Sequence, residues 1–158
     1  NVIAILFDMN KLWEEWVYRR LKKEEVSTGI LVQRQQSANF WDSNLLTSAK
    51  TIRPDIVITT TLKQTIVLDT KWKIVDDLIP GDEDLKQMYI YNLFWDCYRS
   101  VLLYPAKGMS HNHGYYIDYR DGTKQHTKCT VQTISILDDK NGLHADFGIY
   151  SLAAILQK

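Results

Sequence analysis

The stretch RPDIVITTTLKQTIVLDTKWK, residues 53–73, decides the fold that we expect for this chain. It contains two runs rich in β-branched residues on either side of a short polar turn near residues 62–64, which predicts two adjacent strands. Asp55 stands where the first strand begins, and Asp69 and Lys71 stand near the end of the second. If the strands pair as an antiparallel hairpin about that turn, residue 55 lies roughly opposite residue 71, and the two aspartates can converge.

Asp69 and Lys71 are two residues apart, so they project from the same face of the second strand. Aspartate and lysine are depleted from strands, and their presence in a buried-looking strand needs a physical reason. One reason is a hard divalent cation such as Mg²⁺, which takes carboxylate oxygens and lowers the pKa of a bound water, while the lysine stabilises developing negative charge. The other is a plain ion pair where the strand leaves the core. The two residues alone leave both interpretations open.

The helix expected over residues 8–25 carries two adjacent glutamates. Glu15 has Lys11 one turn before it and Arg19 one turn after it, which is typical of a solvated row of ion pairs. Glu14 has no basic residue at those positions and stands beside apolar residues, so it is the better candidate for a carboxylate at the edge of the core. Two surface glutamates without a functional role are the alternative.

The remaining pattern predicts a mixed α/β domain built around one sheet, in the order helix, three strands, helix, strand, followed by a β-hairpin and a helical tail. We expect loops over residues 37–51 and 106–114. The other expected elements are a helix at 8–25, strands at 29–36, 55–61, 65–73 and 101–105, a helix at 82–99, a hairpin turn at 121–122 leading into a strand at 128–137, and a helical tail at 151–158.

The composition fits one globular domain of 158 residues. Its 19 basic and 19 acidic residues balance, so the net charge does not indicate a nucleic-acid partner. Cys97 and Cys129 lie far apart without a CxxC motif, which argues against a zinc ribbon and a disulfide scaffold and favours a reducing, cytoplasmic environment. Because no apolar run approaches the roughly 20 residues of a membrane span, we expect no membrane partner. The sequence has no initiator methionine, so we expect it to be the C-terminal part of a longer chain.

Pro54–Asp55 followed by Asp69–Thr70–Lys71 resembles the signature of the PD-(D/E)xK nucleases, and the expected αβββαβ order resembles the restriction-endonuclease-like core of that superfamily. Gln87 and Tyr91 are one helical turn apart, as in RecB-like members. Residues 8–105 look like McrC, the nuclease subunit of McrBC-type, 5-methylcytosine-dependent restriction systems. The segments that carry this likeness are MNKLWEEWV, IRPDIVI, VLDTKWK and DLKQMYIYN.

The resemblance implies that residues 1–158 form a single PD-(D/E)xK endonuclease domain. It would act as a hydrolase, a type IV restriction-like deoxyribonuclease that cleaves phosphodiester bonds of double-stranded DNA with a metal-activated water. Lys71 would position or activate that water, and Gln87, together with Tyr91, would orient the lysine or the DNA strand. The implied ligands of Mg²⁺, for which Mn²⁺ can substitute, are Asp55, Asp69, the backbone carbonyl of Thr70, and Glu14.

The resemblance also implies a partner, the GTP-dependent AAA+ motor McrB. The chain contains no GxxxxGK[ST] motif, so we do not expect it to bind GTP itself. Two alternatives remain open at this point: a RecB-like or Holliday-junction-type nuclease of DNA repair, and a non-catalytic DNA-binding or assembly module on the same fold. His111 and His113 are a weaker metal-binding candidate, because they stand in an expected loop without acidic or thiol partners.

Overall fold

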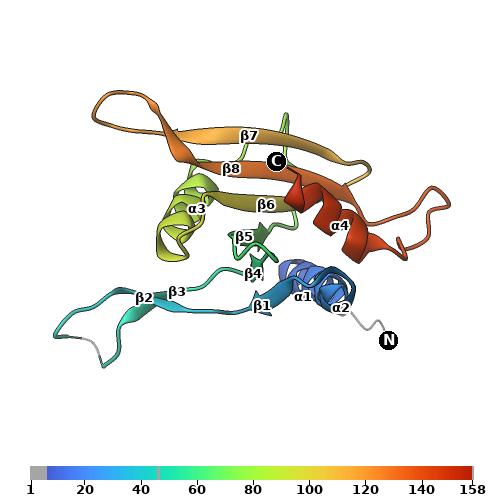
Figure 1. Ribbon diagram of the computed structural model, residues 1–158, viewed down its shortest axis with the longest axis horizontal. Helices are drawn as coiled ribbons and strands as arrows, with labels where there is room; N and C mark the ends of the chain where they lie inside the picture. The colour runs from blue at the N-terminus through green and yellow to red at the C-terminus, as the bar shows by residue number, and fades with distance from the viewer. Residues whose placement is uncertain (1–6, 46, 158) are drawn as a thin grey trace, which may run out of the picture.

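A six-stranded mixed sheet organises the chain in the computed structural model, which describes residues 7–45 and 47–157 (Figure 1). The helices are α1 (Met9–Lys23), α2 (Glu25–Thr28), α3 (Asp82–Phe94) and α4 (Phe147–Leu156). The strands are β1 (Leu31–Arg34), β2 (Ala38–Trp41), β3 (Lys50–Ile52), β4 (Ile56–Thr59), β5 (Thr65–Thr70), β6 (Arg99–Ala106), β7 (Ser110–Ile117) and β8 (Lys124–Ser135).

The strand order in the main sheet is β1-β4-β5-β6-β8-β7. Strands β1, β4 and β5 are antiparallel neighbours, β5, β6 and β8 run parallel, and β7 returns antiparallel to β8. Helix α3 forms the crossover that parallel pairing of β5 with β6 requires. The expected mixed α/β class, the C-terminal hairpin and the helical tail are confirmed. The expected αβββαβ order holds only for the elements of the main sheet, because β2 and β3 lie between β1 and β4 in the chain.

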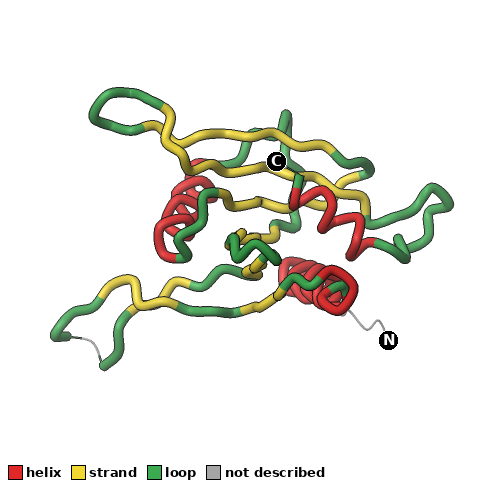
Figure 2. The backbone as a smooth tube through the Cα atoms, in the orientation of Figure 1, coloured by secondary structure: helices red, strands yellow, loops and turns green. Residues whose placement is uncertain are grey.

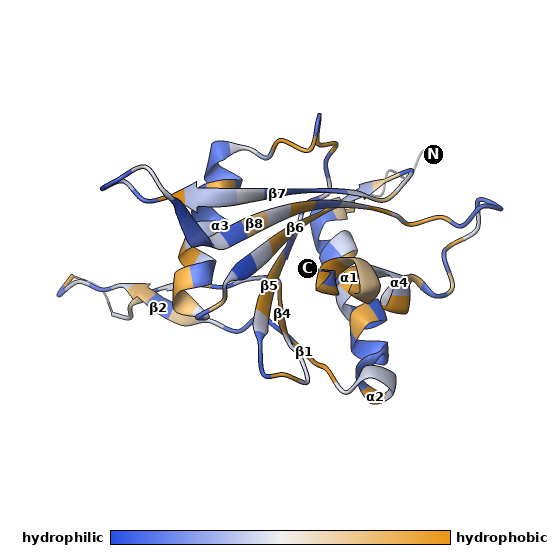
Figure 3. Ribbon diagram, turned by 45° about the horizontal axis from the view of Figure 1, so that its top comes forward, coloured by the Kyte–Doolittle hydropathy of each residue, from blue (hydrophilic) through white to orange (hydrophobic). Residues whose placement is uncertain are grey.

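Helices cover both faces of the sheet, with α1 and α4 together on one side and α3 on the other (Figure 2). Alternate residues of β5 supply the two cores: Ile66 and Leu68 face α1 and α4, whereas Val67 packs with Met88 and Tyr91 of α3. Apolar residues accordingly gather on the central strands (Figure 3). By the same alternation Asp69 lies on the α3 side of the sheet, on the face opposite to Ile66 and Leu68.

The hairpin of β4 and β5 has a different register from the one expected. Ile56 pairs with Leu68, and continuing that register by one residue sets Asp55 opposite Asp69 instead of residue 71. The reason is the turn, in which the amide of Thr60 donates to the carbonyl of Gln64, so that its centre is Leu62. In the observed register the two aspartates are direct neighbours across the strands, which is closer than the sequence predicts.

Both expected loops contain strands, so those two predictions are wrong. Residues 37–51 include β2 and the start of β3, which form a separate two-stranded sheet. Residues 106–114 include the first half of β7, where His111 and His113 lie. The residues of these strands are largely exposed, because β7 is a sheet edge and β2 and β3 lie outside the main sheet. The alternation of apolar and polar residues that marks a half-buried strand is therefore missing.

Helices α1 and α3 begin within one residue of the predicted positions but end earlier, whereas α4 begins at Phe147, four residues before the predicted start of the helical tail. The Asp8 side chain accepts a hydrogen bond from the amide of Lys11 and caps α1, which ends at Lys23 and is followed by the short α2. Helix α3 ends at Phe94, because the chain turns near Asp96 to enter β6 at Arg99. Across the residues that the structure describes, none of the helices combines the length and the apolar character that crossing a membrane requires.

Candidate active site

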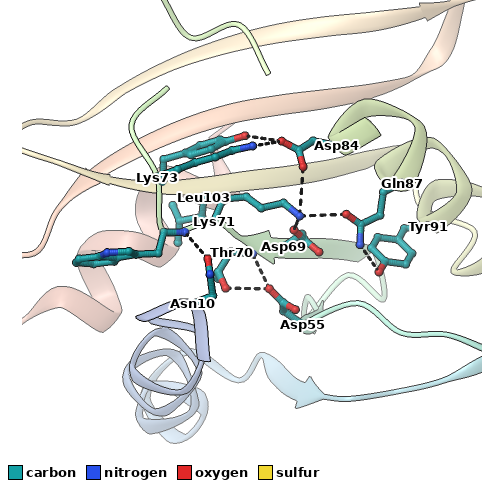
Figure 4. A network of polar contacts seen from close by, with 12 residues as sticks. Asn10, Asp55, Asp69, Thr70, Lys71, Lys73, Asp84, Gln87, Tyr91 and Leu103 are labelled. Atoms are coloured by element: carbon teal, nitrogen blue, oxygen red, sulfur yellow. Dashed lines mark hydrogen bonds and ion pairs between the residues drawn. The ribbon is translucent and has the colours of Figure 1, made fainter. Parts of the chain in front are cut away.

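Two carboxylates meet where β4 begins and β5 ends (Figure 4). Asp55 immediately precedes β4, and its Oδ2 accepts hydrogen bonds from the backbone amide and the hydroxyl of Thr70, at 2.7 and 2.8 Å. Asp69 is the penultimate residue of β5 and is only 3% exposed. The pairing of the two strands therefore fixes the position of both acids with backbone hydrogen bonds, and Thr70 ties Asp55 to the end of β5.

The carboxylate of Asp69 is in an unfavourable environment for a negative charge. Burial, and then the negative charge of Asp55, raise the pKa of Asp69. Within the described residues its Oδ2 is buried without a hydrogen-bond partner. The ammonium of Lys71 lies 2.7 Å from this oxygen, so the contact is a close ion pair that lacks hydrogen-bond angles. Asp69 thus offers a buried oxygen that a cation stabilises.

Lys71 is held by three groups at once. Its Nζ lies 2.7 Å from Asp69 Oδ2, 3.3 Å from Asp84 Oδ1 and 3.1 Å from Gln87 Oε1. Burial lowers the pKa of Lys71, but the carboxylates of Asp69 and Asp84 outweigh burial, and the pKa is raised. The side chain is therefore a protonated ammonium at neutral pH, which can donate hydrogen bonds and stabilise negative charge but cannot take up a proton.

Gln87 and Tyr91 connect Lys71 to the segment before β4. Gln87 Nε2 donates to the hydroxyl of Tyr91 at 2.8 Å, and that hydroxyl donates to the carbonyl of Arg53 at 2.9 Å. Burial raises the pKa of Tyr91 to about 12, so the hydroxyl keeps its proton. Tyr91 is also part of the core between α3 and the sheet, so it both packs and lies beside the candidate site.

The two glutamates of α1 have the contrasting surroundings that the sequence predicts. Glu15 forms ion pairs with Arg19, at 2.5 Å, and with Arg34. Glu14 is half-buried and forms no ion pair with any residue that the structure describes. Burial, and then the charge of Asp55, raise the pKa of Glu14. Glu14 is therefore the glutamate on the side of the site.

The carboxylates that the structure describes near the end of β5 do not form a three-residue metal-binding group. Of the described residues, no three His, Cys, Asp or Glu side chains are close enough to hold one metal ion together, so Glu14 lies outside the group of Asp55 and Asp69. Proteins commonly bind Mg²⁺ with one or two carboxylates, and waters and substrate phosphates complete the octahedron. The buried, unbonded Oδ2 of Asp69 beside a second carboxylate fits such an ion.

The sequence pattern misses two residues of this network. Asp84 forms ion pairs with Lys71 and Lys73, although the helix dipole alone is enough to explain acids in the first turn of its helix. The available signal is its spacing, because Asp84 precedes Gln87 by three residues and so shares its helix face. Asn10, in the first turn of α1, accepts a hydrogen bond from the backbone amide of Trp72 through its Oδ1, at 3.2 Å.

His111 and His113 do not join this site. Both project from β7, with ring centroids 5.0 Å apart, and His113 Nδ1 lies 2.9 Å from the hydroxyl of Thr130 on β8. Burial lowers the pKa of His113.

Comparison with known proteins gives one family and one fold. A family model described as "McrBC 5-methylcytosine restriction system component" matches residues 1–105. No curated protein matches the sequence. A chain in the refined half-complex from the tetradecameric assembly of Thermococcus gammatolerans McrB AAA+ hexamers with bound McrC has a similar structure, with a TM-score of 0.53 and 18% identity over 94% of this chain. The match covers 34% of that longer chain, about a third of its length.

Proposed function

Because this chain belongs to the family of McrBC 5-methylcytosine restriction system components, we propose that it is the Mg²⁺-dependent endonuclease part of such a system. In this proposal the fold is a PD-(D/E)xK core, and the chain hydrolyses phosphodiester bonds of double-stranded DNA. The observation that carries the proposal is the meeting of Asp55 and Asp69 on paired strands, with the ammonium of Lys71 held 2.7 Å from Asp69.

Asp55, Asp69 and the backbone carbonyl of Thr70 would hold the Mg²⁺ ion, and Glu14 would support its water shell from α1. When bound there, Mg²⁺ supplies positive charge for the phosphate and lowers the pKa of a water. The protonated Lys71 orients the attacking water and stabilises negative charge that develops on the phosphate. Gln87 fixes the direction of the lysine through Oε1, and Tyr91 in turn fixes Gln87.

The family assignment favours this proposal over a RecB-like or Holliday-junction-type nuclease of DNA repair. It also supports a partner. The related solved assembly is described as McrB AAA+ hexamers with bound McrC, and we propose that the protein containing this chain docks on a GTP-dependent motor of that kind. The proposal extends to 5-methylcytosine-containing DNA as the substrate, with recognition of the modified base left to the motor.

Cleavage by the protein together with its motor tests the catalytic proposal. The substrate is a supercoiled plasmid that carries 5-methylcytosine, in the presence of Mg²⁺ and GTP. Asp69→Asn should lower the rate by about 100-fold or more, because it removes a ligand charge from the reacting centre. Asp76→Asn is the matched control, since Asp76 is an exposed acid in the connection after β5, and it should leave the rate unchanged.

Two results would count against the proposal. Cleavage at the normal rate by a folded Asp69→Asn variant would show that the site is not catalytic. Stable binding of the motor or of methylated DNA without any cleavage by the unchanged protein would favour the non-catalytic assembly module instead. Circular dichroism of both variants shows whether loss of activity reflects loss of folding.

A further inference from the structure

Asp84 lies at the junction of two lysines at the edge of the candidate site (Figure 4). Its Oδ2 is 2.7 Å from Lys73 Nζ and 3.5 Å from the hydroxyl of Tyr104, while its Oδ1 is 3.3 Å from Lys71 Nζ. The side chain is 14% exposed. Burial raises the pKa of Asp84, but Lys73 and Lys71 outweigh burial and hold it below its usual range, so the group is a carboxylate at neutral pH.

The position of Lys71 conflicts with the cation that the proposed function requires. Its ammonium lies 2.7 Å from Asp69 Oδ2, which is the oxygen that has no hydrogen-bond partner among the described residues. A divalent cation and an ammonium cannot share one carboxylate oxygen at contact distance without strong repulsion. The ammonium must therefore leave Asp69 when a cation binds there, and a half-buried ammonium is stabilised by another acceptor.

Asp84 is already placed to accept the ammonium of Lys71. Lys73 and Tyr104 occupy one oxygen of Asp84, so the carboxylate is already oriented and its other oxygen points at Lys71. Gln87 Oε1, at 3.1 Å, lies on the same helix face as Asp84 and gives the ammonium a second, neutral partner. A small movement of Lys71 away from Asp69 therefore ends on a fixed carboxylate and an amide oxygen.

Resting on the proposed function, we propose that Asp84 is a positioning residue that takes the ammonium of Lys71 when a divalent cation occupies Asp69. It would keep the lysine charged and close to the reacting phosphate while freeing the metal ligand. Asp84 itself would not bind the cation. This role is distinct from helix-end electrostatics, which would give its neighbours in the first turn of α3 the same importance.

Calorimetric titration of the chain with Mn²⁺ alone tests this role through a double-mutant cycle. Asp84→Asn should weaken Mn²⁺ binding by about three- to tenfold, because Lys71 then stays on Asp69 and competes with the ion. Lys71→Met, which keeps the aliphatic part of the side chain, should strengthen binding. In the Lys71→Met background, Asp84→Asn should have no further effect, since the competing ammonium is gone.

Two further variants sharpen the experiment. Glu83→Gln changes the same charge in the same helical turn, but Glu83 is exposed and pairs with Lys86 at 2.6 Å, so Mn²⁺ affinity should not change. Asp84→Glu keeps a carboxylate and should recover affinity relative to Asp84→Asn.

The outcomes separate the two proposals. Equal weakening by Asp84→Asn with and without Lys71 would mean that Asp84 acts on the metal or the fold directly, and the positioning role would be wrong while the nuclease proposal stands. The positioning role would also be wrong if Glu83→Gln weakened binding as much as Asp84→Asn. No Mn²⁺ binding by the unchanged chain would overturn the proposed metal site, and the positioning role with it.

Discussion

At the scale of single residues, the two neighbouring glutamates of α1 are distinguished by their surroundings. Glu15 is neutralised by Arg19 and Arg34, whereas Glu14 is half-buried and its pKa is raised by burial and by Asp55. A carboxylate without an ion-pair partner among the described residues, close to a second carboxylate, is the kind of group that perturbs a nearby cation site. Helical spacing could indicate the pairing of Glu15 with Arg19, one turn away, but the contributions of Arg34 and Asp55 come from other elements and only the structure shows them.

We therefore expect Glu14→Gln and Glu15→Gln to differ. Glu14→Gln should lower the cleavage rate by about 10- to 100-fold, as loss of a group supporting a metal site does. Glu15→Gln should leave the cleavage rate within about twofold and cost less than about 1 kcal/mol of stability, because its ion pairs are partly exposed. Rates from single-turnover cleavage check this, and a larger loss for Glu15→Gln would reverse the assignment.

Asp69 should make the metal-free protein less stable as the pH rises. Because its pKa is raised in the folded state, the folded protein keeps a proton that the unfolded chain has lost, so stability falls from the ordinary carboxyl range up to the raised pKa. Asp69→Asn removes this titration, so the stability of the metal-free variant should fall less between pH 5 and pH 7 than that of the unchanged protein. Urea unfolding at pH 5 and pH 7, with a chelator present, measures the free energy of unfolding of both proteins. The prediction is contradicted if that free energy changes with pH by the same amount in Asp69→Asn as in the unchanged protein.

At the scale of elements, helix α3 connects core packing with the site. Asp84, Gln87 and Tyr91 recur at intervals of three and four residues, so one helix face carries all three toward the end of β5. Tyr91 fixes this face to the sheet through the carbonyl of Arg53. The helix thereby determines where the ammonium of Lys71 can lie.

Tyr91→Phe tests this connection. It removes the acceptor of Gln87 Nε2 and the donor to Arg53, and should cost about 1 kcal/mol of stability and slow cleavage less than Gln87→Ala does. Tyr89→Phe in the same helix is the control, because Tyr89 contacts Tyr116 through its ring. Thermal unfolding and cleavage rates are the measurements. Equal effects of the two variants would show that the hydrogen bonds of the Tyr91 hydroxyl do not support the position of Gln87 and Lys71.

Helices α1 and α4 approach each other at Gly148. A Cβ added there would clash with the carbonyl oxygen of Arg20, so Gly148→Ala should destabilise the protein by about 2 kcal/mol. Gly108→Ala is the control, because nothing lies within 4 Å of a Cβ at that position. Thermal unfolding midpoints measure this difference, and a midpoint of Gly148→Ala equal to that of Gly108→Ala would contradict the predicted clash. Cleavage should also fall in Gly148→Ala, since α1 carries Glu14.

The elements that could be predicted are those whose apolar residues repeat. The alternation in β5 correctly put Asp69 on the face away from Ile66 and Leu68, because both faces of that strand are buried. Strands β2, β3 and β7 have no such pattern, since they are exposed and are held by backbone pairing. The register of the β4–β5 hairpin depended on one turn hydrogen bond, from Thr60 to Gln64, which residue types alone do not fix.

At the scale of the whole molecule, the fold gathers residues that the chain separates. Asp55 and Asp69 are brought together by strand pairing, and the sequence could predict this because only a short turn joins the strands. Asp84 reaches Lys71 through the irregular connection of residues 71–81, which includes positive φ angles at Asp77 and Leu78. Helical spacing places Asp84 on the same face as Gln87, but no periodic pattern describes this connection, so the contact of Asp84 with Lys71 is visible only in the structure.

The central claim is that the acids where β4 begins and β5 ends hold the cation of a nuclease. Anomalous diffraction from a crystal of the chain grown with Mn²⁺ tests it most directly. We predict a single strong peak about 2 Å from carboxylate oxygens of Asp55 and Asp69, with the ammonium of Lys71 moved from Asp69 to Asp84. A peak bound elsewhere, or no peak while Lys71 still contacts Asp69, would contradict the claim.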